Sequence, residues 1–182
     1  MANDETLRPA NLDPAAPVSA AWSLRHLHPG NFGLVMATGI LSIGLQTLGH
    51  PGLGDAMAVF ALAVWVLLLA ASLLRLLRHP HAVRDDLLNP RMVFSFFTLV
   101  AATSIVGLLL HMHGQVAPAI GCWALAFTAW CLLLYLAFSV LTFLTHEHNV
   151  NIVHGGWLIA IIGTQSLVLL GARIAPDLGP YA

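Results

Sequence analysis

The chain has 182 residues, of which 58% are hydrophobic and only 8% are charged, and its formal net charge is −1. A soluble domain carries about 25% charged residues, so this sequence has too few polar side chains to cover a water-exposed surface. We therefore expect an integral membrane protein that contacts the lipid bilayer. The near-neutral charge argues against binding to nucleic acid.

The long apolar runs lack the alternation of barrel strands and predict membrane-spanning helices of about 20 residues each. We predict an all-α membrane protein with about five transmembrane helices in residues 31–172. A polar cytoplasmic tail, 1–30, precedes them and a short tail, 173–182, follows. The predicted spans are about 31–48, 56–74, 92–110, 119–144 and 152–172.

Three interruptions separate the first four predicted spans. His50-Pro51-Gly52 predicts a tight turn. The stretch Arg75–Arg91 is polar, and we expect a hinge there. The uncharged run from Met92 to His146 is too long for one crossing, and Gly114, Gln115 and Pro118 predict a break at His111–Pro118.

The arginines predict the orientation of the chain. Arg8 and Arg25 precede the first span and four arginines lie between spans two and three, whereas the loops after spans one and three have none. Cytoplasmic loops carry an excess of basic residues, so we expect a cytoplasmic N-terminus in the cell membrane. Arg173 is the one charge that opposes this orientation.

The stretch Asn31–Gln46 has polar residues at helical spacing within an apolar segment. Four of them are expected on one helical face: Asn31, Thr38, Ser42 and Gln46. Three small residues are expected on the opposite face: Gly33, Ala37 and Gly44. A small-residue stripe allows close approach of a neighbouring helix, and a polar stripe needs water or a partner.

The odd-numbered spans carry hydroxyls, amides and glycines, whereas spans two and four are nearly all apolar. This asymmetry predicts that spans one, three and five face an interior path. The alternative is that these residues mediate ordinary helix–helix contacts. No span has a charged residue or histidine in its middle. A passive path is therefore favoured, and hydroxyl and N–H donors suit an anion.

The ten histidines include four His-x-His pairs: His26/His28, His79/His81, His111/His113 and His146/His148. A metal site or a pH-responsive rim would use such residues, and so would an axial haem site. Because the pairs lie outside the spans, we favour their role as polar residues at the membrane interface. We predict no metal, no cofactor and no catalytic residues, and hence no enzyme.

Three segments carry a resemblance to a known family: LHPGNFGLVMATGILSIGLQ, LNPRMVFSFFTLVAATSIVG and GGWLIAIIGTQSLVLLGA. They resemble the first, third and fifth helices of the tellurite-resistance/C4-dicarboxylate transporter family, which also includes plant slow-type anion channels. The resemblance covers about residues 27–172. The third segment has the form seen in bacterial permease members, which implies a bacterial inner membrane. It implies a ten-helix bundle whose odd helices line a pore for C4-dicarboxylate, tellurite or small inorganic anions.

The resemblance also implies the residues of the pore wall. They are Asn31, Thr38, Gly39, Ser42, Gln46, Thr98, Thr103, Gly163, Thr164, Gln165 and Ser166. Five spans match only the N-terminal half of the family bundle, so we expect an incomplete copy, or a pore completed by a homo-oligomer or a second chain. The alternative functions are a non-transporting membrane subunit or remnant that packs with partner helices and, less favoured, a haem-binding subunit.

Overall fold

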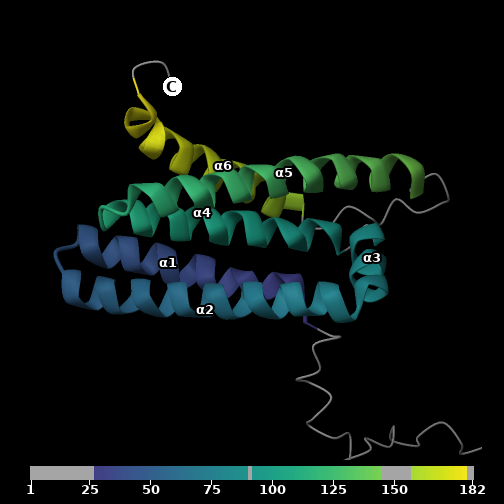
Figure 1. Ribbon diagram of the computed structural model, residues 1–182, viewed down its shortest axis with the longest axis horizontal. Coiled ribbons are helices and arrows are strands. Elements are labelled where there is room, and N and C mark those ends of the chain that lie inside the picture. Colours follow the sequence, from purple (N-terminus) through teal and green to yellow (C-terminus); the bar gives the residue numbers. More distant parts are fainter. Residues whose placement is uncertain (1–26, 90–91, 145–156, 180–182) are drawn as a thin grey trace, which may run out of the picture.

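The computed structural model describes residues 27–89, 92–144 and 157–179, which form helices and no strand (Figure 1). The predicted all-α fold is therefore confirmed. The α-helices are α1 (Phe32–Thr47), α2 (Pro51–Arg78), α3 (Pro80–Leu88), α4 (Phe97–Met112), α5 (Val116–Leu144) and α6 (Trp157–Ile174). Short 3-10 helices are η3 (Pro29–Asn31), η4 (Val93–Phe96) and η6 (Ala175–Leu178).

Four helical segments in the described residues are long and apolar enough to cross a membrane: Pro51–Arg78, Val93–Met112, Val116–Val140 and Trp157–Leu178. The remaining long segment, α1, has 16 residues. At 1.5 Å per residue it extends about 24 Å, somewhat less than the hydrocarbon core of about 30 Å. The prediction that α1 is a fifth span thus stays a prediction, and residues 152–156 of the last predicted span lie outside the described part of the chain.

The turn between the first two helices differs from the predicted one. His50-Pro51-Gly52 was expected to form it, but α2 already begins at Pro51. Gly49 makes the turn instead, with a φ of +83° that favours glycine. Proline is well suited to the first helical position, because the N–H group it lacks would have no partner there. The Pro51-Gly52 pair was therefore wrongly interpreted as a turn.

The predicted polar hinge Arg75–Arg91 is largely helical. The last turn of α2 continues to Arg78, and α3 follows after a single residue, with Pro80 at its start. Figure 1 shows α3 lying across the end of α2 rather than in line with it. α3 has exposed polar residues and no buried residue, which suits a position at the membrane surface. Charged side chains do not prevent helix formation there.

Two further boundaries also differ from expectation. The break before the fourth span is shorter than His111–Pro118, because α5 begins at Val116 and includes Pro118 in its first turn. Proline is tolerated in the first turn of a helix. The predicted C-terminal tail, 173–182, includes the last residues of α6, which ends at Ile174, and then η6.

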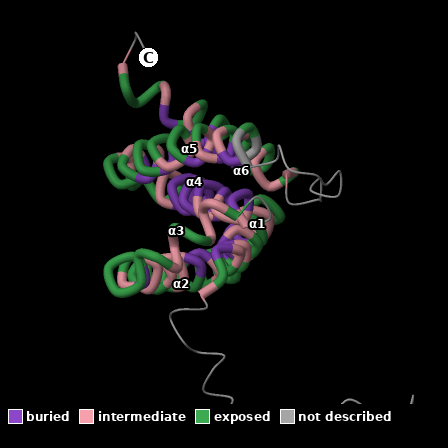
Figure 2. The backbone as a smooth tube through the Cα atoms, turned by 90° about the vertical axis from the view of Figure 1, so that its right-hand side faces the viewer, coloured by how far each residue is buried: buried purple, intermediate pink, exposed green. Residues whose placement is uncertain are grey.

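The helices form two layers, and α4 lies at the centre of the bundle (Figure 2). α4 packs against α1 on one side and α6 on the other, while α2 covers α1 and α5 covers α4. Every residue of α4 from Val100 to Leu109 is buried. The apolar core has two main parts, one around Phe97 and Val100 toward α5 and α6, and one around Val35 and Val106 toward α1 and α2.

Candidate pore wall

The three helices predicted to line a path, α1, α4 and α6, lie in one layer with α4 in the middle. The two helices predicted to face lipid, α2 and α5, lie in the other layer (Figure 2). Exposed large apolar side chains occur on α2 and α5, and also on the outward faces of α1 and α6. The layer of α1, α4 and α6 is the candidate pore wall.

Two of the predicted polar residues of α1 face α2. The Ser42 hydroxyl is fully buried and donates a hydrogen bond to the Gly54 carbonyl at 2.7 Å. The Gln46 amide donates to the Asp55 carboxylate at 3.2 Å. These two side chains thus join the first hairpin, and they do not point toward an open path.

The other polar residues of α1 have less extensive contacts. The half-buried Thr38 donates to the Leu34 carbonyl of its own helix at 2.9 Å. Asn31 is exposed at the N-terminal end of α1, and its side chain does not cap the helix. The outward face of α1 is instead apolar, with Leu34, Ile40 and Leu41 about half exposed.

The glycines of α1 divide into two groups. Gly39 is buried, and a Cβ atom there would collide with Ile105 of α4, so glycine is required for this close crossing. Gly33 and Gly44, on the predicted small-residue stripe, have nothing within 4 Å of an added Cβ. The close helix–helix approach that was expected at Gly33 and Gly44 therefore occurs at Gly39. Among the described residues, no neighbouring helix lies within 4 Å of the Cβ position at Gly33 or Gly44.

The hydroxyls of α4 are used within the bundle. Thr98 is buried and lies 2.8 Å from the Pro29 carbonyl and 2.7 Å from the Ser95 carbonyl, so it fixes η3 against the start of α4. Thr103, at 1% exposure, accepts a hydrogen bond from Trp65 Nε1 of α2 at 3.1 Å. Ser104 is equally buried, but its hydroxyl has no hydrogen-bond partner among the described residues.

The predicted residues of α6 have three different environments. Gly163 is buried, and an added Cβ would lie 3.2 Å from the Phe97 carbonyl of α4. Thr164 accepts a hydrogen bond from Trp130 Nε1 of α5 at 2.9 Å, and Ser166 donates to the Ile162 carbonyl of its own helix at 2.8 Å. Gln165 is exposed and lies on the same outward face as Ile161, Ile162 and Val168.

Two tryptophans connect the layers, and their hydrogen-bond partners were not predicted from the sequence. Trp65 and Trp130 each reach from an outer helix to a threonine of an inner helix. A tryptophan N–H normally finds an acceptor when buried, so a lone tryptophan in an apolar span is a signal for a hydroxyl on the facing helix. Thr103 and Thr164 thus serve contacts between helices in this structure.

Charged groups lie at the two ends of the bundle. At one end, Arg75 is buried and its guanidinium contacts the Asp86 carboxylate at 2.6 Å. At the other end, His113 contacts Asp55 at 3.1 Å and His111 contacts Asp177 at 2.8 Å. Among the described residues, no group of three His, Cys, Asp or Glu side chains is placed to hold a metal ion.

The ion pair of His113 favours its charged form. The ring donates to the Leu109 carbonyl from Nδ1 at 2.8 Å and lies against Asp55 through Nε2. The Leu109 carbonyl, and then Asp55, raise the pKa of His113 above its ordinary value of 6.5. A doubly donating imidazole must be protonated, so these contacts form a charged link between α4 and α2.

Comparison with models of protein families gives a match. The model of a family described as SLAC1, voltage-dependent anion channel, matches residues 26–182 of the chain. The search of curated proteins and the search of solved structures each returned no match.

Proposed function

Because the chain belongs to the voltage-dependent anion channel family, we propose that it moves small anions across a membrane along the candidate pore wall. The family match over residues 26–182 is the observation that carries this proposal. The two-layer arrangement supports it, since the helices with polar residues lie together and the apolar ones lie outside. The anion is a C4-dicarboxylate, tellurite or a small inorganic anion such as chloride.

Within this proposal, the predicted residues divide by their contacts. Ser42, Thr98, Thr103 and Thr164 hold the helices of the wall in position through their hydrogen bonds. Gln165 is the residue we assign to the path. Its amide is exposed in the middle of α6 among apolar side chains, and it has no partner among the described residues. An amide N–H at that position would replace water around an anion.

The rest of the open wall is apolar, which suits a passive path with few binding sites. Conduction requires that an anion bind weakly enough to leave. A single layer of three helices does not surround a path, so we propose that further helices close it. These further helices belong to residues outside the described part of the chain, to a second copy of this protein or to another protein. The end with Arg75 and Arg78 faces the cytoplasm in this proposal.

Anion flux tests the proposal directly. We would reconstitute the protein in liposomes and measure efflux of chloride, malate and tellurite. Gln165→Glu places a negative charge on the path and should suppress flux by about tenfold or more, because like charges repel in a low-dielectric site. Thr128→Val, on the exposed face of α5, is the control and should leave flux unchanged. Absence of flux for all three anions in the wild type would refute the proposed activity.

One observation favours a second candidate, a membrane subunit that packs with partner helices. The open face of α1 combines Gly33, Ala37 and Gly44, and small residues allow helices to approach closely. If this face is only a packing surface, Ala37→Leu should abolish a stable oligomer measured in detergent while wild-type liposomes show no flux. Flux by the wild type would favour transport.

A further inference from the structure

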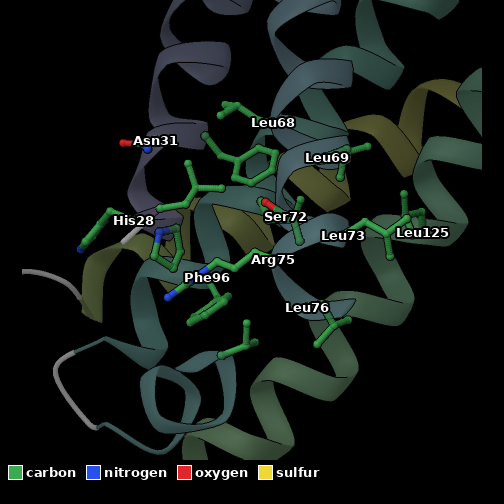
Figure 3. A pocket seen from close by; sticks show the side chains of 15 residues that line it. His28, Asn31, Leu68, Leu69, Ser72, Leu73, Arg75, Leu76, Phe96 and Leu125 are labelled. Carbon is green, nitrogen blue, oxygen red and sulfur yellow. The ribbon is translucent and has the colours of Figure 1, made fainter. Parts of the chain in front are cut away.

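A recess of about 390 Å³ lies between α2 and α5, with the start of α4 as its floor (Figure 3). The N-terminal end of α1 also lines it, through Asn31 and Phe32, so the recess adjoins one end of the candidate pore wall. The α2 side is formed by Leu68, Leu69, Leu73 and Leu76, which share one helical face. Leu125 of α5 lines the same recess. Its volume is in the range of about 300–1,000 Å³ that is typical of ligand sites.

The recess is apolar in its depth and polar at one end. At that end it meets a second recess, also about 390 Å³, which shares Leu27, His28 and Arg75 with it. The second recess is completed by Asp85 and Asp86 of α3. Figure 3 shows Arg75 extending from α2 toward His28 and Phe96, where the apolar part ends. The two recesses together therefore form one amphipathic groove.

The position of the groove matches the membrane boundary. α3 lies across the end of α2 and carries charged residues, so it marks the headgroup region (Figure 1). The leucines of α2 lie further into the apolar segment, at the depth of the acyl chains. An occupant must then be polar at the level of α3 and apolar below it.

The charges of the polar end select between headgroups. Arg75 and Asp86 form an ion pair and neutralise each other. Asp85 is exposed and makes no ion pair among the described residues, so its carboxylate is available to a cation at the mouth. His28 Nδ1 accepts a hydrogen bond from the Gly30 N–H, which leaves the Nε2–H group as a donor. The mouth thus offers a carboxylate for a cation and an N–H donor for a phosphate oxygen.

We propose that this groove binds one phospholipid with an ammonium-bearing headgroup, of the phosphatidylethanolamine class. One acyl chain lies along Leu69 and Leu73 against Leu125. The phosphate lies near His28 and the ammonium group lies near Asp85. An anionic lipid without the ammonium group, such as phosphatidylglycerol, binds less well, because it offers no cation to the Asp85 carboxylate.

The acyl-chain part is tested by native mass spectrometry of the delipidated full chain titrated with phosphatidylethanolamine. One bound lipid per protein is expected. Leu69→Trp fills the groove and should weaken binding by about tenfold, the loss expected when about two methylenes no longer enter. Leu67→Trp, whose side chain is 68% exposed and outside the groove, is the matched control and should bind as the wild type does. Equal binding by the two variants would overturn the site.

The headgroup assignment has its own test, which does not depend on a core substitution. The wild type, titrated with equal phosphatidylethanolamine and phosphatidylglycerol, should retain the former preferentially. Asp85→Asn should reduce this preference, whereas Asp177→Asn, the same charge change at the opposite end of the bundle, should not. Equal retention of both lipids by the wild type, or an equal effect of both substitutions, would overturn the assignment. Circular dichroism of each variant verifies its helical content.

Discussion

The crossing of α1 and α4 at Gly39 is expected to tolerate no additional atom. Gly39→Ala places a methyl group against Ile105, which is itself buried at 5% exposure. A β-branched side chain has few χ1 alternatives in a helix, so Ile105 cannot rotate away, and the helices must separate. Overpacking of this type costs about 1–3 kcal/mol.

Gly44→Ala is the matched control for this change. Both glycines lie inside α1, so the gain in helix propensity of about 0.5–1 kcal/mol is common to both variants. An added Cβ at Gly44 meets nothing within 4 Å. The difference between the two variants thus isolates the contact with Ile105, and Gly39→Ala should be less stable than Gly44→Ala by about 1–3 kcal/mol.

The assay is reversible unfolding of the purified protein in mixed micelles, followed by the circular dichroism signal as the fraction of denaturing detergent rises. The free energies of unfolding of the two variants are compared under identical conditions. Equal stability, or a more stable Gly39→Ala variant, would refute the reasoning, since it would mean that α1 and α4 do not approach each other closely at this point.

Three further substitutions test the hydrogen bonds and the ion pair, each by the same unfolding assay. Trp65→Phe removes the donor to Thr103 and should cost about 0.5–1.5 kcal/mol, while no loss would show that this bond is not formed. Ser104→Ala removes a buried hydroxyl without a partner among the described residues and should leave stability unchanged or raise it by about 1–3 kcal/mol, so a clear loss would contradict the assigned environment. The contribution of His113 should be complete below its unfolded-state pKa of about 6.5 and be lost as pH rises through its raised folded-state pKa; His113→Gln should abolish this pH dependence, and an unchanged dependence would contradict it.

The features that the sequence predicted are those that depend on long-range composition. The low charge and the long apolar runs identified a helical membrane protein, and the odd–even asymmetry separated α1, α4 and α6 from α2 and α5. Errors arose where a local signal has two physical meanings. Pro51 suggested a turn, although proline is equally suited to the first position of a helix, and the charges of Arg75–Arg91 hid the helix α3.

The environments of the polar residues were harder to predict, because one helix does not reveal its neighbours. Helical periodicity correctly placed Ser42 and Gln46 on one face of α1. That face contacts α2, however, and not an open path. The donors Trp65 and Trp130 lie 38 and 34 residues from their acceptors, and no local pattern connects them. The same holds for Asp85 and the leucines of α2, which only the folded chain brings to one groove.

The enclosure of α4 has a consequence for synthesis. Chains are made from the N-terminus, so α4 enters the membrane when α1 and α2 are present and α5 and α6 do not yet exist. At that stage Thr103 already has Trp65 as a donor, but the Phe97 and Val100 side still faces lipid until α5 and α6 arrive. The nascent protein therefore passes through a stage in which α1 to α4 are present and one apolar flank is uncovered. A ribosome-stalled chain ending before α5 should expose that flank to lipid-phase cross-linkers, and the finished chain should not.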